Sequence, residues 1–286
     1  MKKAAVNKIG LIAGGGEYPV VFAREAAAKG CAVHTVALEG AADSRLEALS
    51  ASIKYFKLGQ LSAPIKALRD AGVEKAVMTG LVRHGSIFSV LSADLRAAAF
   101  LARLPDFRAE SILGAIVKEF AKDGIEIISS ATFLEHLLPK PGLLGRVRPG
   151  KLQEKSIEFG QRIARQLAAA DVGLTAVVCD RMIVALEALE GTDQCILRSG
   201  ELYRAAVAGQ KVDQSKTSGL VVVKAARPRQ DFRFDLPVIG VRTIESMARA
   251  GAKTLAIEAG STLMLSRQEL LSKADSEGIS VTAFTA

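Results

Sequence analysis

The stretch KIGLIAGGGEYP, residues 8–19, decides how the first half of the chain folds. Residues 8–13 are apolar enough to form a buried strand, and a helix is predicted over residues 19–29. The turn between them holds Gly14, Gly15 and Gly16. Glycines at such a turn let a backbone approach a phosphate, and the helix N-terminus favours an anion. We therefore expect these glycines to contact a phosphorylated substrate, while a simple tight turn remains an alternative.

The same alternation of strand and helix continues to residue 130. Strands are predicted at residues 32–38, 53–58, 75–79 and 126–130, with helices near 63–71, 93–103 and 110–123. Continuous apolar strands that alternate with helices are typical of a parallel sheet covered on both faces. The fold class is therefore α/β, with a Rossmann-like N-terminal domain over residues 1–140.

Prolines and glycines interrupt the chain after this domain. The motifs PKPG at 139–142 and PG at 149–150 indicate a linker over residues 141–151. Residues 152–286 then predict a C-terminal α/β domain with a mixed sheet. Its predicted helices cover 152–170, 193–207, 243–250 and a segment from 267, and its predicted strands cover 175–179, 182–186, 219–225, 254–258, 261–265 and 279–283.

The composition narrows the class of partner. With 38 Lys and Arg against 30 Asp and Glu, the 286-residue chain carries a formal charge of +8, which suits phosphorylated metabolites, phospholipid headgroups or nucleic acid. The basic residues are dispersed and lack the interleaved aromatics of single-strand binders, so we expect no nucleic-acid partner. The three cysteines lack metal-ligand spacing, and no apolar run suits a signal peptide or a membrane span. We therefore expect a cytoplasmic protein.

A second candidate site lies in TGLVRH, residues 79–84. It follows the fourth predicted strand, and ligands in open α/β sheets bind beyond the carboxyl ends of the strands. We expect Thr79 and Gly80 to approach the substrate and Arg83 to hold a phosphate or carboxylate. A surface loop with a solvated arginine accounts for the pattern equally well.

NAD(P) binding is an alternative for the glycine turn. Glu39 follows the second predicted strand, where dinucleotide-binding proteins place a ribose-binding carboxylate. Pro19 replaces the third glycine of that fingerprint and suits the first turn of a helix. An NAD(P)-dependent oxidoreductase therefore matches only part of the fingerprint.

Two acidic clusters in the second half indicate phosphate chemistry. The first, EALEGTD at residues 187–193, ends a predicted strand and turns at its glycine. The second, DFRFD at residues 231–235, is read as an extended segment. In that conformation Asp231, Arg233 and Asp235 would share one face, opposite the two phenylalanines.

Such carboxylates suit a hard cation. Mg²⁺ prefers one or two carboxylates together with water and substrate phosphates. Lys224, Arg227 and Arg233 are placed in the sequence to share the charge that a metal-bound phosphate develops. An edge strand with alternating solvated charges remains the alternative.

Several unusual strings make the sequence resemble the LpxI-type UDP-2,3-diacylglucosamine pyrophosphatases of lipid A biosynthesis. They are GLIAGGGEYP, TGLVR with SADLR after it, ALEALEGTD, KAARPRQDFRFDLPVIG and AIEAGSTL, in this order over nearly the whole chain. The family often has lysine in place of Arg227 and a small residue in place of Arg229. Either cation can sit beside phosphate, so the implied reaction is unchanged.

The resemblance implies an N-terminal α/β domain, a C-terminal domain, and Mg²⁺-dependent cleavage of the substrate to UMP and 2,3-diacylglucosamine 1-phosphate. It marks Asp235 as the essential aspartate, with Glu190 and Asp193 as further contacts to metal or substrate. The candidate residues are then Asp235 and Asp193 for catalysis; Asp235, Asp231 and Glu190 for the metal; and Gly14, Gly15, Gly16, Thr79, Gly80, Arg83, Thr192, Lys224 and Arg233 for the substrate.

The resemblance implies the substrate, while the other expected partners follow from charge and from the usual behaviour of soluble proteins. The substrate is an acylated UDP-glucosamine, and the positive charge favours transient, peripheral contact with the inner membrane surface. A homodimer is expected as the usual form of a soluble oligomer. A non-catalytic protein that binds a sugar nucleotide or a lipid remains a further alternative.

Overall fold

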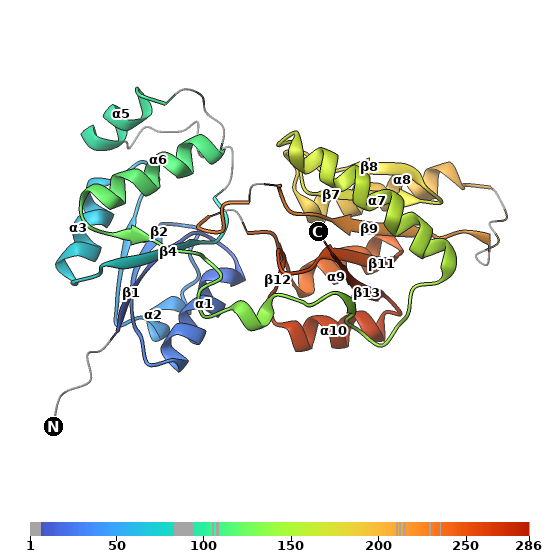
Figure 1. The fold of residues 1–286 in the computed structure, drawn as a ribbon, viewed down its shortest axis with the longest axis horizontal. Coiled ribbons are helices and arrows are strands. Elements are labelled where there is room, and N and C mark those ends of the chain that lie inside the picture. Colours follow the sequence, from blue (N-terminus) through green and yellow to red (C-terminus); the bar gives the residue numbers. More distant parts are fainter. Residues whose placement is uncertain are drawn as a thin grey trace. The chain divides into compact units, whose positions relative to one another are not determined.

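The computed structural model describes residues 7–82, 94–104, 106, 109–209, 211, 213, 216–228, 230–234 and 236–285. The chain forms two compact units (Figure 1). The first comprises Met1–Glu135 and Asp231–Asp235, and the second comprises His136–Gln230 and Leu236–Ala286. Two features differ from the predicted division. The stretch predicted as a linker begins with a short strand of the second unit, and the second acidic cluster belongs to the first unit.

The first unit is built on a five-stranded, wholly parallel sheet in the order β3-β2-β1-β4-β5. Its strands are β1 (Lys8–Ala13), β2 (Ala32–Leu38), β3 (Ser52–Phe56), β4 (Lys75–Thr79) and β5 (Glu126–Ile127). Its helices are α1 (Glu17–Ala28), α2 (Leu46–Leu49), α3 (Ser62–Asp70), α5 (Leu95–Leu101) and α6 (Ala109–Lys122). The predicted Rossmann-like α/β fold is confirmed, and its strand order reverses between β1 and β4, where such sheets bind ligands.

The core of the first unit explains why these segments fold as they do. Side chains of successive strand residues point to opposite faces of the sheet. Ala76 therefore packs toward Leu68 of α3 and Phe120 of α6 in one apolar cluster. Helix α1 lies against the other face and buries Val20 and Phe22 completely (Figure 1).

The second unit is built on a six-stranded mixed sheet in the order β6-β13-β11-β9-β7-β8, as predicted for its class. Its strands are β6 (Gly142–Leu143), β7 (Thr175–Cys179), β8 (Met182–Leu186), β9 (Leu220–Lys224), β11 (Ala252–Glu258) and β13 (Ser280–Phe284). Strands β9, β11 and β13 run parallel; β7 is antiparallel to β8 and β9, and β6 to β13. A separate parallel pair joins β10 (Val238–Ile239) to β12 (Leu263–Met264).

Helices cover both faces of this second sheet. Helix α7 (Lys151–Ala169) packs on one face, where the missing side chain of Gly160 lets it approach β9. A Cβ at Gly160 would lie 2.6 Å from the Cγ2 of Val223. On the other face lie α8 (Thr192–Ala206), α9 (Val241–Ala250) and α10 (Arg267–Ser276). This three-layer packing determines which strand residues face α8, and the candidate site of the second unit is built from those residues.

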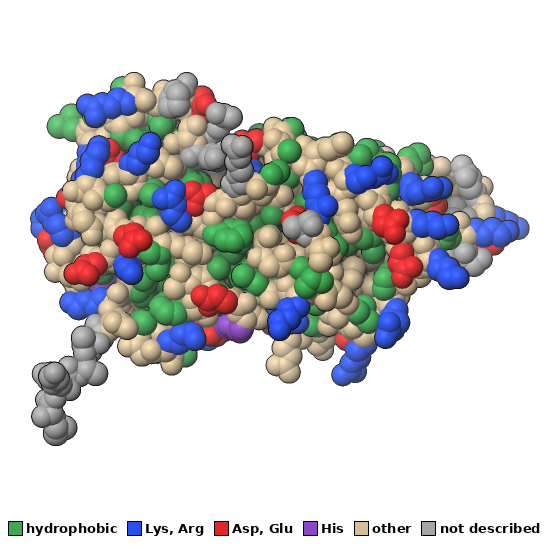
Figure 2. Space-filling model, viewed as in Figure 1, with side chains coloured by type: hydrophobic (Ala, Val, Ile, Leu, Met, Phe, Trp, Pro, Cys, Tyr) green, Lys and Arg blue, Asp and Glu red, His purple; other side chains and the backbone are tan. Residues whose placement is uncertain are grey.

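The surface matches the dispersed charge seen in the sequence. On the face shown in Figure 2, basic and acidic side chains are interspersed over both units. Among the described residues, no helix combines the length and apolar character needed to cross a membrane.

Candidate functional site

The glycine turn and the loop after β4 meet at the carboxyl edge of the first sheet. The N–H of Gly14 donates to the carbonyl of Thr79 at 2.8 Å. Gly15 and Leu81 exchange two backbone hydrogen bonds, of 2.9 and 2.8 Å. The structure thus brings together two of the predicted substrate-binding segments. The amides of Gly14 and Gly15 already have acceptors, however, so they are not free to cradle a phosphate.

Close packing explains the glycines at this edge. A Cβ at Gly14 would lie 2.8 Å from the carbonyl oxygen of Leu81. A Cβ at Gly80, whose φ is +92°, would lie 2.8 Å from the carbonyl carbon of Gly14. The tight-turn interpretation therefore accounts for these two positions. It weakens the NAD(P) alternative as well, because dinucleotide binding uses the backbone of this turn to approach the pyrophosphate.

Gly16 and Thr79 keep groups that a ligand could use. Gly16, with φ +90°, immediately precedes α1, and a Cβ there would meet nothing within 4 Å. The Oγ1 of Thr79 is buried and makes no hydrogen bond within the described part of the chain. An unpaired buried hydroxyl costs free energy, and a ligand could satisfy it. Arg83, the remaining candidate of this loop, lies outside the described residues.

The carboxyl edge of the second sheet is built from charged side chains instead. The ammonium of Lys224, at the end of β9, donates to the Oγ1 of Thr192 at 2.8 Å. That hydroxyl donates to the Oε1 of Glu187 at 3.1 Å, and the Oε2 of Glu187 lies 3.9 Å from the ammonium. Lys224 also approaches the hydroxyl of Thr175 at 3.5 Å. These four residues form what we call the Lys224 cluster.

Thr175, Glu187 and Lys224 of the Lys224 cluster are buried, and Thr192 is half-buried. The exposed fraction is 4% for Lys224 and 9% for Glu187. An ammonium beside the first residue of α8 is repelled by the positive end of the helix dipole, and the negative charge of Glu187 offsets that repulsion.

Cys195, one turn into α8, is fully buried, and burial raises the pKa of its thiol to about 12. The thiol is therefore protonated at neutral pH and unsuited to nucleophilic attack.

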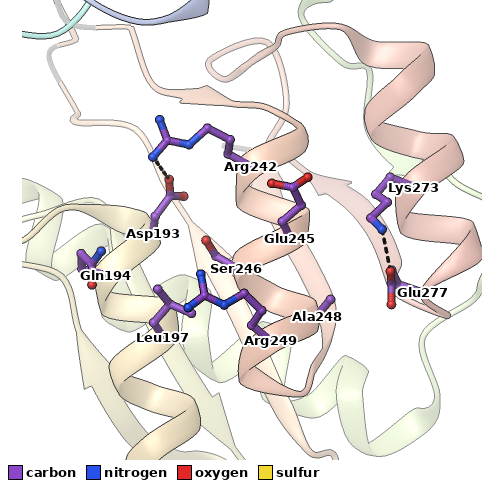
Figure 3. A pocket seen from close by; sticks show the side chains of 10 residues that line it. All are labelled: Asp193, Gln194, Leu197, Arg242, Glu245, Ser246, Ala248, Arg249, Lys273 and Glu277. Atoms are coloured by element: carbon purple, nitrogen blue, oxygen red, sulfur yellow. Dashed lines mark hydrogen bonds and ion pairs between the residues drawn. The ribbon is translucent and has the colours of Figure 1, made fainter.

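The other two carboxylates of the first acidic cluster are each engaged by an arginine. Arg198 holds Glu190 at 2.5 Å and donates to the carbonyl of Leu186 at 2.8 Å. This hydrogen bond lowers the pKa of Glu190. Asp193 lies 3.8 Å from Arg242 of α9. Figure 3 shows the two side chains pointing toward each other across one end of a hollow of about 420 Å³ between α8, α9 and α10.

The second acidic cluster does not form the extended segment predicted from its alternation. Residues 232–234 form a turn, and the N–H of Phe234 donates to the carbonyl of Asp231 at 3.2 Å. The side chain of Asp231 accepts from the backbone N–H of Arg233 at 3.1 Å and from its guanidinium at 2.7 Å. These bonds to Arg233 lower the pKa of Asp231. The prediction was wrong because a side chain that bonds the backbone two residues on stabilises a turn.

Packing holds this turn on the first unit. The carbonyl of Phe232 accepts from both the N–H and the hydroxyl of Ser130, at 2.7 and 2.8 Å. Phe234 packs against the apolar cluster under α3 and α6. Asp235, the predicted essential aspartate, follows immediately but lies outside the described residues.

The predicted metal ligands do not form a cation site within the described part of the chain. Glu190 and Asp231 belong to different units, and each is engaged by an arginine. No group of three or more His, Cys, Asp or Glu residues is positioned to bind a metal among the residues described. Glu258, at the end of β11, accepts from the N–H of Ala226 at 3.0 Å. The described donor set therefore does not fit a bound Mg²⁺ by itself.

Glu187 is the site residue that sequence reasoning passed over. It begins the motif EALEGTD, but the sequence predicts Glu190 of that motif as the metal ligand. The missed signal was strand periodicity. Ala185 of β8 faces α8, so the residue two positions later should also face it.

Comparison with known proteins covers both units. A family model described as the LpxI N-terminal domain matches residues 8–137, and one described as the LpxI C-terminal domain matches residues 140–282. The chain is 34% identical over 282 residues to a protein of Caulobacter vibrioides named UDP-2,3-diacylglucosamine pyrophosphatase LpxI. The alignment covers 96% of this chain and 97% of that relative.

Proposed function

Because this chain belongs to the LpxI family, we propose that it hydrolyses the pyrophosphate of UDP-2,3-diacylglucosamine to UMP and 2,3-diacylglucosamine 1-phosphate. The observation that carries the proposal is the match of both family domains in order, together with a named relative aligned along nearly the full length of both chains. The carboxyl edge of each sheet supports it with groups suited to a phosphorylated ligand.

Lys224 and Thr192 are the described side chains best suited to the diphosphate. A buried ammonium held at a helix N-terminus creates a positive field in a medium of low dielectric. Charge that develops on phosphate oxygens during cleavage is stabilised by such a preorganised donor. We assign Lys224 this electrostatic role and Thr192 the role of its hydrogen-bonded support.

Asp235 is the proposed catalytic carboxylate. The assignment rests on its place in the family motif RFDLP. Its role would be to orient the attacking water or accept its proton, and water attack on one phosphorus balances the reaction by releasing two phosphomonoesters. Asp193 is proposed as a second contact; its ion pair with Arg242 would have to open for it to reach substrate or water.

Dependence on Mg²⁺ is proposed from the family resemblance alone. A bound divalent cation would neutralise charge on the diphosphate. Among the described carboxylates, Glu190 and Asp231 could contribute only after leaving their arginines.

In the first unit, Gly16, Thr79 and Gly80 are proposed to contact the substrate, together with Arg83. The unpaired hydroxyl of Thr79 is the specific observation behind this role. We further propose a cytoplasmic protein that meets the inner membrane surface transiently and forms a homodimer.

The decisive experiment combines product analysis with one substitution. Purified protein with Mg²⁺ and UDP-2,3-diacylglucosamine should release UMP, and a chelator should stop the release. Phosphorus-31 NMR of products formed in ¹⁸O-labelled water would show which phosphate received the water oxygen. Asp235→Ala should bind the substrate without cleaving it. Wild-type turnover by this variant would remove Asp235 from the mechanism, and absence of UMP release by the wild type would reject the activity.

A further inference from the structure

We propose that Glu187 is a positioning residue, which fixes the ammonium of Lys224 through the hydroxyl of Thr192. This inference rests on the proposed function, because it gives Lys224 a task at a phosphate. Glu187 itself would touch neither substrate nor water. Its task would be to hold the hydroxyl of Thr192 and, through that hydroxyl, the ammonium of Lys224 that faces the phosphate.

The register of the sheet places Glu187, Thr175 and Lys224 side by side on three neighbouring strands. Thr175 of β7 is paired with Lys224 of β9 on one side. On the other side, the N–H of Glu187 donates to the carbonyl of Thr175 at 2.9 Å, which extends the pairing of β8 with β7. The side chains of these three residues therefore project from neighbouring strands toward the same face, where α8 begins.

The backbone at residues 173–174 packs closely against Glu187 and supplies one donor to its carboxylate. A Cβ at Gly173 would lie only 2.2 Å from the carbonyl oxygen of Glu187, so no larger residue fits there. The N–H of Leu174 donates to the Oε2 of Glu187 at 3.3 Å. With Thr192 on its Oε1, both carboxylate oxygens have donors. A buried carboxylate needs such partners, because transfer from water is otherwise costly.

The hydroxyl of Thr192 transmits the constraint. A hydroxyl has one hydrogen, and the carboxylate of Glu187 can only accept it. Lys224 can only donate, so the same hydroxyl oxygen must accept from the ammonium. The carboxylate thus fixes the direction of the hydroxyl, and the hydroxyl fixes the ammonium.

Glu190 shows that this arrangement is specific within the acidic cluster. It lies three residues after Glu187 but is held by Arg198 on the exposed side of the turn. Glu187 is buried and acts on Lys224. The two carboxylates therefore have different tasks.

The first test is a double-mutant cycle on UMP release. Glu187→Gln keeps the shape but removes the charge, and we expect kcat to fall about 10- to 100-fold with little change in KM. Lys224→Met should remove more activity, and Glu187→Gln added to it should remove nothing further, because residues that act as a unit are not additive. Glu201→Gln, an exposed carboxylate on the same helix, is the matched control and should leave kcat unchanged.

The linking hydroxyl gives a second pair of variants. Thr192→Val fills the same space without a hydroxyl and should reproduce the loss seen in Glu187→Gln. Thr192→Ser retains the hydroxyl and should recover much of the activity that Thr192→Val loses. If the serine and valine variants are equally impaired, the hydroxyl does not transmit the effect and the proposal is overturned.

A readout independent of turnover separates this proposal from the proposed function. In protein with ¹⁵N-labelled lysine, the side-chain NMR signal of Lys224, assigned by its loss in Lys224→Arg, should be protected from exchange. In Glu187→Gln that signal should move toward those of the exposed lysines. If the wild type releases no UMP, the proposed function fails while this measurement still tests the positioning. An unchanged signal, or full activity of a folded Glu187→Gln variant, overturns the positioning role.

Discussion

The two units place different kinds of group at the carboxyl edge of their sheets. In the first unit, Gly14, Gly15 and Gly80 bring two loops together through backbone hydrogen bonds. In the second unit, Lys224 and Glu187 place opposite charges under the start of α8. The first edge depends on the absence of side chains, whereas the second depends on their charge.

This difference indicates how each edge would tolerate change. At the edge of the first sheet, a side chain added to one of these glycines would clash with the neighbouring backbone, so we expect mainly a loss of folding stability. A charged edge can keep its shape when a charge is removed, and the loss should appear mainly in chemistry. Substitutions at each edge, compared for their effects on activity and on stability, test this difference.

Lys224→Met should produce the largest effect on the reaction. Loss of a preorganised cation at a developing phosphate charge is expected to lower kcat about 100- to 1,000-fold. UMP release by the folded variant measures it. Lys253→Met, which removes an exposed lysine of β11, serves as the control and should be fully active. Equal activity of the two variants would contradict the claim that the edge of the second sheet acts through the charge of Lys224.

Gly80→Ala should produce the largest effect on the stability of the first unit. The alanine combines a positive φ with a contact 2.8 Å from the backbone of Gly14, for a cost of about 2–4 kcal/mol. Hydrogen exchange of the β1 and β4 amides would report the loss. Gly30→Ala has a similar φ of +79° but meets nothing within 4 Å, so it should cost only about 1–2 kcal/mol. If the two variants are equally destabilised, close packing does not explain the glycine.

Ser130→Ala should have a smaller effect, on the attachment of the turn at residues 231–234. It removes the hydroxyl bond of 2.8 Å to Phe232 and leaves the backbone bond in place, for a cost of about 1 kcal/mol. Faster hydrogen exchange at Phe234 would show it. Ser276→Ala removes a hydroxyl bond of the same length from an exposed position and should change stability by less than about 0.5 kcal/mol.

Glu190→Gln should give the smallest effect, and one that depends on pH. The folded-state pKa of Glu190 is lowered by Arg198, so its contribution is present above the unfolded pKa of about 4.5 and lost as pH falls through the lower folded value. The pair is partly exposed, so wild type and variant should differ by at most about 1 kcal/mol at pH 7. Unfolding measured at pH 7 and pH 3 should show the difference shrink; a constant difference would exclude the ion pair as its cause.

Local patterns in the sequence predicted most of the fold. The apolar runs of β1, β2 and β4 and the long amphipathic helix α7 lie where periodicity placed them. In each of these elements, the spacing of apolar residues predicts which face is buried. The predictions were less accurate where structure depends on distant residues. Strand β6 has only two residues and is defined by its pairing with β13.

The candidate site divides in the same way. Position at the end of a strand was enough to mark Gly14, Thr79 and Lys224 as candidates, and the structure brings Gly14 to Thr79 and Lys224 to Thr192. Alternation failed at residues 231–234 because the side chain of Asp231 accepts from the backbone N–H of Arg233, and because Phe234 packs on the core of the first unit, most of which comes much earlier in the chain. Roles within the acidic cluster depended on which carboxylate Arg198 could reach, and spacing alone does not contain that information.

The bond from Ser130 to Phe232 spans 102 residues of sequence, and this has a consequence for biosynthesis. A ribosome delivers the N-terminal unit first, and domains usually fold as they emerge. Here the five-stranded sheet can form early. Residues 231–235, whose Phe232 carbonyl accepts from the N–H and the hydroxyl of Ser130, are translated only after most of the second unit. Until then, the apolar cluster that Phe234 later contacts lacks this cover on the nascent chain. Completion of the first unit is therefore tied to synthesis of the second.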